Sequence, residues 1–312
     1  TREIAEKITI YWPSGITQIL QDIPTGFLYT ITEPKSPAQK INPPGLAKST
    51  GTMFSSSEEG LAIVTHQEKE YDDFQRQKLL PNKSSQLGPG MAWGDIDGDG
   101  DDDVFIGGAA GFVGMLFLNL GDGQFKHALQ FCFTYDVHSE DMGALFIDFD
   151  RDGDLDLYVV SGGVECEPGE AVLRDRLYIN DGSGNFGKGT LDLLPDIRSS
   201  GSVVAAADID GDSHLELFIG GRIIPGKYPE APQSYVLRYT GFRYEDATDV
   251  FAPEIKRLGM VTSALFTDVD SDHHPDLLVT YEWGPVRYFH NEEGKLIDRT
   301  SQSGLADRQG WY

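Results

Sequence analysis

The chain has 312 residues, of which 39% are hydrophobic, which is enough for a buried core and excludes a wholly disordered protein. Its formal net charge is −25, from 50 acidic and 25 basic residues, and this balance argues against binding to nucleic acid or to an anionic membrane surface. The sequence has no apolar run of the roughly 18 residues that a membrane span needs. Its 36 glycines and 16 prolines predict the many tight turns of an all-β fold.

The first 33 residues predict a short β segment. Residues 8–12 and 16–20 have the composition of two strands, with Pro13, Ser14 and Gly15 as the turn of a hairpin, and residues 27–31 would add a third strand. Residues 34–50 are rich in proline and are predicted to be a linker. Because the chain begins inside a predicted strand, we expect the parent protein to extend further upstream.

From residue 51 to residue 312 the sequence is organised as a repeat. Four acidic loops share one pattern and begin 53, 60 and 60 positions apart. The loops are residues 95–103, 148–156, 208–216 and 268–276. Each lies between two short apolar runs, and a further apolar run follows, which gives about four short strands per repeat. This period is typical of propeller blades. We therefore expect an all-β fold, a β-propeller of four-stranded antiparallel blades that is incomplete at about four blades.

Two smaller features lie outside this pattern. Residues 66–80 are compatible with a helical turn. The two cysteines, Cys132 and Cys166, are too few for a disulfide framework, and a single bridge between them stays open. Cys132 lies between Phe131 and Phe133 in a strand-like aromatic run, so it would equally suit the core.

The acidic loops carry oxygen ligands at a spacing that suits a metal ion. Asp at positions 1, 3 and 5 of a tight loop turns three carboxylates toward one centre, while position 7 supplies a backbone carbonyl and position 9 a carboxylate from the next strand. Hard oxygen ligands in this number suit Ca²⁺ better than Mg²⁺, which keeps more water. We therefore predict up to four Ca²⁺ ions. The predicted ligands are Asp95, Asp97, Asp99, Asp101, Asp103, Asp148, Asp150, Asp152, Asp154, Asp156, Asp208, Asp210, Asp212, His214, Glu216, Asp268, Asp270, Asp272, His274 and Asp276.

Two other interpretations of the loops are weaker. An EF-hand begins with the same pattern but needs a bidentate Glu at position 12. That position is apolar in every loop: Ile106, Val159, Ile219 and Val279. A purely structural acidic turn would explain one such loop, because Asp and Gly favour turns, but it explains four copies in the same context less well.

The third and fourth loops depart from the pattern. Position 6 is Ser213 and His273 instead of Gly, and Glu216 replaces Asp at position 9. Glycine adopts positive φ without a steric penalty, so we expect strain or a shifted backbone at Ser213 and His273 and tighter binding in the first two loops. The pair His273–His274 beside Asp272 leaves zinc as a weaker alternative, because adjacent loop residues diverge.

The repeat D-x-D-x-D-G-x-x-D, followed by an apolar strand and Gly-Gly, resembles FG-GAP, or VCBS-type, repeats. Such repeats build calcium-binding propellers like those of integrin α-subunits. The opening segment around Trp12, Gln18 and Leu20 is similar to the tail of an ASPIC/UnbV domain, which accompanies these repeats in many bacterial surface proteins. The resemblance implies an extracellular or cell-surface location, such as the bacterial outer surface or periplasm. It also implies a Ca²⁺-stabilised interaction scaffold, with no catalytic residue to carry over.

Two functional hypotheses follow. The first is a non-enzymatic scaffold that binds a protein or carbohydrate ligand, and whose exposed blade edges pair with the remaining blades of the parent protein or with another copy of the chain. The second is a polysaccharide hydrolase or lyase built on a propeller, because the many carboxylates could include an acid/base pair. The segments 225–232 and 281–285, rich in aromatic residues and proline, either present a ligand surface or simply connect strands.

Overall fold

The computed structural model describes residues 4–12, 16–24, 29, 31–34, 60–307 and 309–310. The chain divides into two compact units, Thr1–Glu58 and Glu59–Tyr312. In the first unit, β1 (Ile4–Tyr11) pairs antiparallel with β2 (Thr17–Pro24), so the expected hairpin is present. Its turn at 13–15, most of the strand expected at 27–31 and nearly all of the linker expected at 34–50 lie outside the described residues.

The second unit consists mainly of four four-stranded antiparallel sheets, each built from consecutive stretches of the chain. The first blade contains β3 (Met91–Gly94), β4 (Asp103–Ile106), β5 (Met115–Asn119) and β6 (Phe125–Ala128). The second contains β7 (Glu140–Ile147), β8 (Asp156–Gly162), β9 (Arg176–Asn180) and β10 (Phe186–Lys188). The third contains β11 (Gly201–Ala207), β12 (Glu216–Gly221), β13 (Tyr235–Tyr239) and β14 (Tyr244–Asp246). The fourth contains β15 (Val261–Thr267), β16 (Asp276–Tyr281), β18 (Arg287–Asn291) and β19 (Leu296–Asp298).

Short elements connect and flank these blades. A two-stranded ribbon joins β17 (Gly284–Pro285) to β20 (Gln309–Gly310). The α-helical turns are α1 (Asp73–Arg76) and α2 (Thr248–Phe251). The 3₁₀ turns are Gly60–Ile63, Phe131–Asp136, Ala171–Leu173 and Pro253–Arg257. No helix in the described part of the chain is long and apolar enough to cross a membrane.

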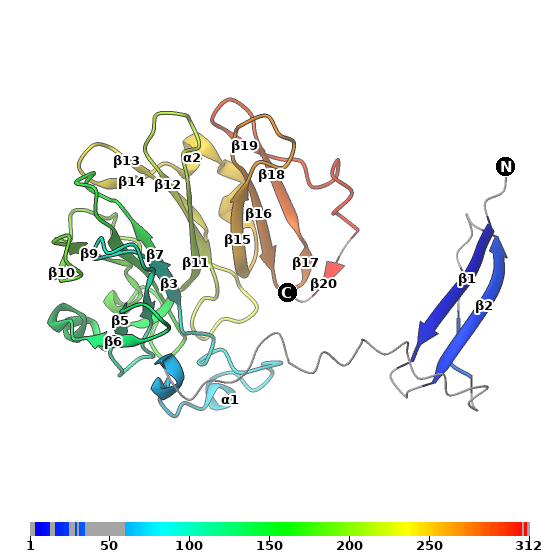
Figure 1. Ribbon diagram of the computed structural model, residues 1–312, viewed down its shortest axis with the longest axis horizontal. Helices are drawn as coiled ribbons and strands as arrows, with labels where there is room; N and C mark the ends of the chain where they lie inside the picture. The colour runs from blue at the N-terminus through cyan, green and yellow to red at the C-terminus, as the bar shows by residue number, and fades with distance from the viewer. Residues whose placement is uncertain are drawn as a thin grey trace. The chain divides into compact units, whose positions relative to one another are not determined.

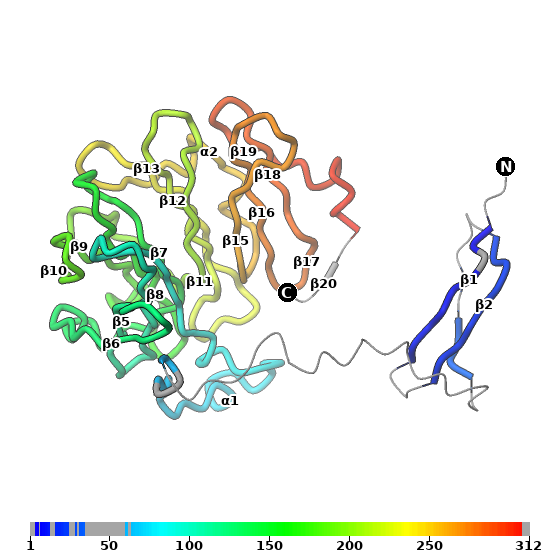
Figure 2. Tube along the Cα trace, in the orientation of Figure 1, coloured from blue at the N-terminus to red at the C-terminus, as the bar shows by residue number. Residues whose placement is uncertain are grey.

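The blades follow one another in chain order and pack face to face (Figure 1; the trace can be followed in Figure 2). The period of two in a strand explains this packing, because alternate side chains point to opposite faces. In β8, Leu157 and Val159 belong to the core shared with the first blade, whereas Tyr158 and Val160 belong to the core shared with the third. The second strand of a blade that has a neighbour on each side therefore has apolar residues on both faces, such as residues 157–160 in β8 and 217–219 in β12.

The two terminal blades each have one face without a neighbouring blade in the described structure. In β3, Ala92 is buried toward the second blade while Met91 and Trp93 on the opposite face are exposed. In β15, Ala264 and Phe266 pack against the core toward the third blade, and Leu265 on the other face is exposed. Four blades without ring closure among the described residues confirm the predicted all-β, incomplete propeller.

Two smaller expectations have different outcomes. The helical turn expected within residues 66–80 is α1, and Asp72 caps it by accepting a hydrogen bond from the Gln75 N–H at 3.1 Å. The strand expected at residues 131–133 is wrong, because this run opens the 3₁₀ helix Phe131–Asp136. Cys132 and Phe133 are both buried in the core between the exposed Phe131 and Tyr135, and both cysteines are free thiols.

Candidate metal sites

Each acidic loop connects the first strand of its blade to the second, so all four loops occur at the same end of the blades. Positions 4 and 6 have positive φ in every loop. At position 4 the residues and angles are Gly98 (78°), Arg151 (65°), Gly211 (77°) and Ser271 (66°). At position 6 they are Gly100 (94°), Gly153 (98°), Ser213 (68°) and His273 (72°). The loop backbone therefore keeps the same conformation where glycine is absent. Of the two expectations for Ser213 and His273, strain or a shifted backbone, the structure shows strain.

The residue at position 9 is fully buried in every loop and ties the loop to the sheet. These residues are Asp103, Asp156, Glu216 and Asp276, each with an exposed fraction of 0%. Each carboxylate accepts a hydrogen bond from the backbone N–H of position 2. The donors are Ile96, Phe149, Ile209 and Val269, at 3.0, 3.0, 2.9 and 3.1 Å. The last predicted ligand is thus the anchor of its own loop.

The residue at position 1 holds the turn together in three of the loops. Asp95 accepts hydrogen bonds from the N–H groups of Gly98, Asp99 and Gly100 at 2.8–3.1 Å. Asp208 and Asp268 accept equivalent bonds from later residues of their loops. These contacts orient the position-1 carboxylates by local backbone donors, and Asp99, Asp212 and Asp272 at position 5 each accept one further backbone N–H.

Several acidic side chains in each loop crowd together. In the first two loops, one oxygen from each of positions 1, 3 and 5 lies within 4.8 Å of the others, and in the last two loops the same holds for positions 1, 3 and 9. The groups are Asp95, Asp97 and Asp99; Asp148, Asp150 and Asp152; Asp208, Asp210 and Glu216; and Asp268, Asp270 and Asp276. Outside these four groups are Asp101, Asp103, Asp154, Asp156, Asp212, His214, Asp272 and His274, of which Asp272 belongs to a fifth group with Asp270 and His290.

Burial and crowding raise the pKa of several of these carboxyl groups. Burial, reinforced by neighbouring carboxylates, raises the pKa of Asp154 to about 6. Burial raises the pKa of Asp156 and of Glu216 to about 7. Three oxygens in the loops, Asp97 Oδ1, Asp154 Oδ1 and Glu216 Oε1, are buried and accept no hydrogen bond. Buried oxygens of this kind are costly unless a cation or a proton compensates them.

The third loop has a built-in cation that the sequence reasoning missed. Arg238, from β13, places Nη2 2.9 Å from Asp210 Oδ2 and 2.9 Å from Asp212 Oδ2. His214 Nδ1 lies 3.0 Å from Asp212 Oδ1. Asp212 is therefore paired with protein groups and does not belong to the carboxylate group of its loop.

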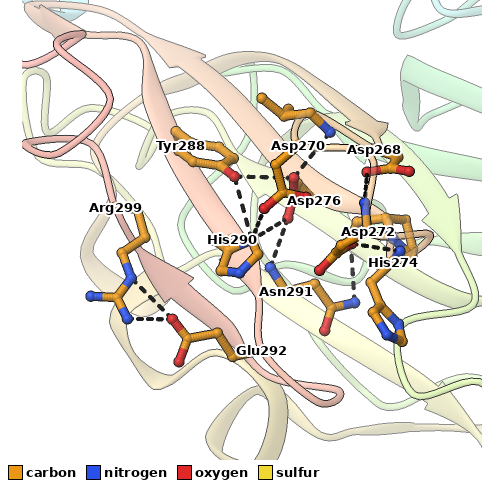
Figure 3. A network of polar contacts seen from close by, with 12 residues as sticks. Asp268, Asp270, Asp272, His274, Asp276, Tyr288, His290, Asn291, Glu292 and Arg299 are labelled. Atoms are coloured by element: carbon orange, nitrogen blue, oxygen red, sulfur yellow. Dashed lines mark hydrogen bonds and ion pairs between the residues drawn. The ribbon is translucent and has the colours of Figure 1, made fainter.

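The fourth loop involves a histidine from the third strand of its blade (Figure 3). His290 Nδ1 lies 3.0 Å from Asp276 Oδ1 and 3.5 Å from Asp270 Oδ2, and His290 also groups with Asp270 and Asp272. Tyr288 Oη donates a hydrogen bond to Asp276 Oδ2 at 3.1 Å. The ring of His274 points away from this cluster (Figure 3). No metal-capable group found among the described residues contains His273 or His274, so the zinc alternative gains no geometric support there.

In three of the four blades an asparagine at the end of the third strand donates to the position-9 carboxylate, and in the second and fourth blades it also connects the loop to the blade before it. The backbone N–H groups of Asn119, Asn180 and Asn291 donate to the position-9 carboxylate at 2.7, 2.8 and 2.8 Å. Asn180 Nδ2 also donates to Ile96 O, in the loop of the preceding blade, at 2.8 Å, and Asn291 Nδ2 donates to Ile209 O in the same way at 2.9 Å. The recurring Asn is visible in the sequence, but its bond across blades is not.

The fold and these loops define a class of protein, a repeat protein of propeller blades with an acidic loop in each blade. Residues 95–159 and 169–219 match the family model of the FG-GAP-like repeat, so the chain carries FG-GAP-like repeats. The resemblance seen in the sequence is confirmed for these repeats, whereas the ASPIC/UnbV resemblance of residues 1–33 stays a prediction.

Comparisons with whole proteins found distant similarity. No curated protein matches the chain. Among solved structures, the Vibrio cholerae biofilm matrix protein Bap1 is similar to it over 67% of this chain and 30% of that one, with 19% identity and a TM-score of 0.31. The match therefore spans less than a third of Bap1. BBS1N, from a complex with ARL6DN, is similar over 68% of this chain and 80% of that one, with 13% identity and a TM-score of 0.29.

We predict that Asn180→Ala destabilises the protein by about 2–3 kcal/mol, because it leaves the carbonyls of Ile96 and Leu155 without their donors. Asn119→Ala is the matched control. Its Nδ2 donates at 3.1 Å to Asp102 O within its own blade, at an exposed position. We expect the control to lose less than about 1 kcal/mol in the free energy of unfolding measured by urea titration. Equal losses for the two variants would contradict a bond between blades as the source of the effect.

Proposed function

We propose that the chain is a calcium-stabilised interaction scaffold of the cell surface or extracellular space, without enzymatic activity, that binds a protein or carbohydrate ligand. One observation carries the calcium part. Asp97 Oδ1, Asp154 Oδ1 and Glu216 Oε1 are buried without hydrogen-bond donors in loops where carboxylates already crowd one another. A hard cation bound in each loop would compensate the negative charge of these oxygens.

The chemistry of the donor set favours Ca²⁺ over other cations. The groups are carboxylates at flexible spacing, which suits six to eight oxygen ligands better than the strict octahedron of Mg²⁺. The residues that would hold the ion are the carboxylate groups of the four loops, with the position-9 side chain beneath them in the first two. Bound calcium would supply charge neutralisation, and so the loops would keep their shape at neutral pH.

The extracellular location and the partners rest on weaker support. Calcium is abundant outside cells, and loops of this type in extracellular modules bind it with dissociation constants of about 10⁻⁴–10⁻³ M. The exposed Met91, Trp93 and Leu265 on the open faces of the terminal blades support pairing with the remaining blades of the parent protein or with another copy of the chain.

We predict that calcium raises the melting temperature. At about 1–2 mM free Ca²⁺ and a dissociation constant of about 10⁻⁴ M, linkage gives roughly 1.4–1.8 kcal/mol for each occupied loop. Scanning fluorimetry after exhaustive chelation should show a lower melting temperature that Ca²⁺ restores and Mg²⁺ restores less. Asp95→Asn should reduce the calcium-dependent shift, and Asp249→Asn, which alters an exposed carboxylate outside the loops, should not. A melting curve that chelation leaves unchanged would refute the calcium proposal.

We also predict that the first two loops bind Ca²⁺ more tightly than the third, because Arg238 occupies part of the third loop. Arg238→Gln should raise the affinity of the third loop roughly fivefold, equivalent to about 1 kcal/mol. Arg243→Gln is the control, since Arg243 pairs with Glu245 away from the loop at an exposed position. Calorimetric titration with Ca²⁺ measures both variants. Weaker binding in Arg238→Gln would show that the arginine supports the site and does not compete with the ion.

One observation favours the second hypothesis, a polysaccharide hydrolase or lyase. Glu140, at the start of β7, is 4% exposed, and burial followed by the charges of Glu68 and Glu165 raises its pKa to about 7, although the Ala110 N–H opposes the shift. Glu140 and Glu165 line one cavity of about 350 Å³ together with His138. A carboxyl group that titrates near neutrality is what a general acid requires.

Glu140→Gln tests this candidate and makes a stability prediction. The folded-state pKa lies above the unfolded value of about 4.5, so the wild type loses stability as the pH rises from about 4.5 to about 7. The variant, which cannot ionise, should therefore be more stable than the wild type by about 3 kcal/mol at pH 8 and nearly equal to it near pH 4.5. Polysaccharide turnover by the wild type that the variant loses would establish the enzyme. Polysaccharide binding without any reaction product would support the scaffold hypothesis.

A further inference from the structure

The two aromatic- and proline-rich segments that the sequence singles out meet in space. Tyr228 lies in the connection between β12 and β13, and Trp283 lies in the tight turn between β16 and β17. Although they are 55 residues apart, Trp283 Nε1–H donates a hydrogen bond to Tyr228 Oη at 2.8 Å. Both residues line an open cavity of about 700 Å³, whose wall also includes Tyr281, Glu282, Leu79 and Pro81. Tyr228 and Trp283 lie in connections that follow the second strand of a blade. The cavity is therefore at the end of the blades opposite the acidic loops.

The aromatic wall is held in place by the backbone. Trp283 has φ of 64°, a left-handed conformation that is unusual for a bulky residue, and its side chain is 59% exposed. Gly259 and Gly284 fix the ring of Tyr281, because a Cβ at either position would lie 2.8 Å or 2.2 Å from that ring. Strain of this kind is retained at binding sites more often than elsewhere.

The polar groups of the cavity wall are the Glu282 carboxylate, the hydroxyl groups of Tyr228 and Tyr281 and the indole N–H of Trp283. The Glu282 carboxylate forms an ion pair with Arg222, and Tyr228 Oη donates to Glu282 Oε2 at 3.4 Å. The N–H of Trp283 is already used by Tyr228. Each carboxylate oxygen has two lone pairs, so Glu282 can accept further hydrogen bonds. A ligand that suits the cavity therefore offers an apolar face to the aromatic rings and several donors to Glu282.

We propose that this cavity binds a neutral saccharide. The C–H face of a sugar ring would stack on Trp283, and its hydroxyl groups would donate to Glu282. The ion pair with Arg222 neutralises Glu282, which disfavours a quaternary ammonium ligand, and the net charge of −25 disfavours an acidic sugar. A proline-rich peptide offers carbonyl acceptors where the cavity needs donors. This inference rests on the proposed interaction scaffold and names its ligand class and its site, but it does not require calcium.

The test is affinity electrophoresis of the whole chain, in calcium-containing gels with the neutral polysaccharides dextran, β-glucan, galactomannan and xylan, or with anionic alginate. We expect at least one neutral polysaccharide to retard the wild type. Trp283→Gly should raise the dissociation constant about tenfold or more. Glycine is unstrained at positive φ, so the melting temperature of this variant should stay equal or rise, and a loss of binding cannot then be ascribed to misfolding. Phe242→Ala is the control, since Phe242 is an aromatic residue that is 61% exposed and does not line the cavity.

The proposal is overturned if no neutral polysaccharide retards the wild type, if Trp283→Gly binds as tightly as the wild type, or if alginate or a polyproline peptide binds in preference at this site. Repeating the measurement with chelator separates the two proposals. Binding that depends on Trp283, in a protein whose melting temperature ignores Ca²⁺, would support the saccharide site and refute the calcium scaffold. A calcium-stabilised protein that binds no neutral polysaccharide would do the reverse.

Discussion

The buried carboxylate at position 9 of each acidic loop is the contact on which the rest of this structure depends. Asp103, Asp156, Glu216 and Asp276 have no solvent exposure, and each accepts the N–H of the second loop residue, which fixes the loop over the start of the second strand. In three blades the same carboxylate also accepts the N–H of a third-strand asparagine. A buried, ionisable group thus joins the loop to two strands, and its cost when ionised is what makes a nearby cation favourable.

The four loops share a backbone and differ in their neighbours. Ser213 and His273 adopt the positive φ that glycine adopts in the first two loops, so the turn itself does not distinguish the sites. The sites differ instead in the residues that the third strand of each blade contributes. In the third blade Tyr239 stands where the other blades have asparagine, and Arg238 beside it reaches into the acidic group. In the fourth blade His290 takes a comparable place. The chemistry of each site is therefore set by residues that pair with the loop only after the sheet has formed.

The two ends of the blades carry different features. Connections between the first and second strands carry the acidic groups, and connections after the second strand carry the aromatic cavity around Trp283. Blades stacked face to face hold both ends, because β8 and β12 give alternate side chains to adjacent cores. On the terminal faces Trp93 and Leu265 are exposed, whereas Val104 and Ile106 of the first blade are covered by Leu61 and Val64.

The sequence by itself determined the repeat, the four-stranded blades, the acidic loops and the incomplete number of blades, because these depend on local spacing and on the period of two in a strand. It also located the segments 225–232 and 281–285 without deciding what they do. Only the tertiary structure showed that Tyr228 and Trp283 touch, that Asn180 bonds the preceding blade, and that Arg238 and His290 reach the acidic groups. It also showed that the aromatic run at Phe131 forms a 3₁₀ helix. These outcomes depend on strand pairing and blade stacking between residues distant in the chain, and no local pattern encodes which side chains such contacts bring together.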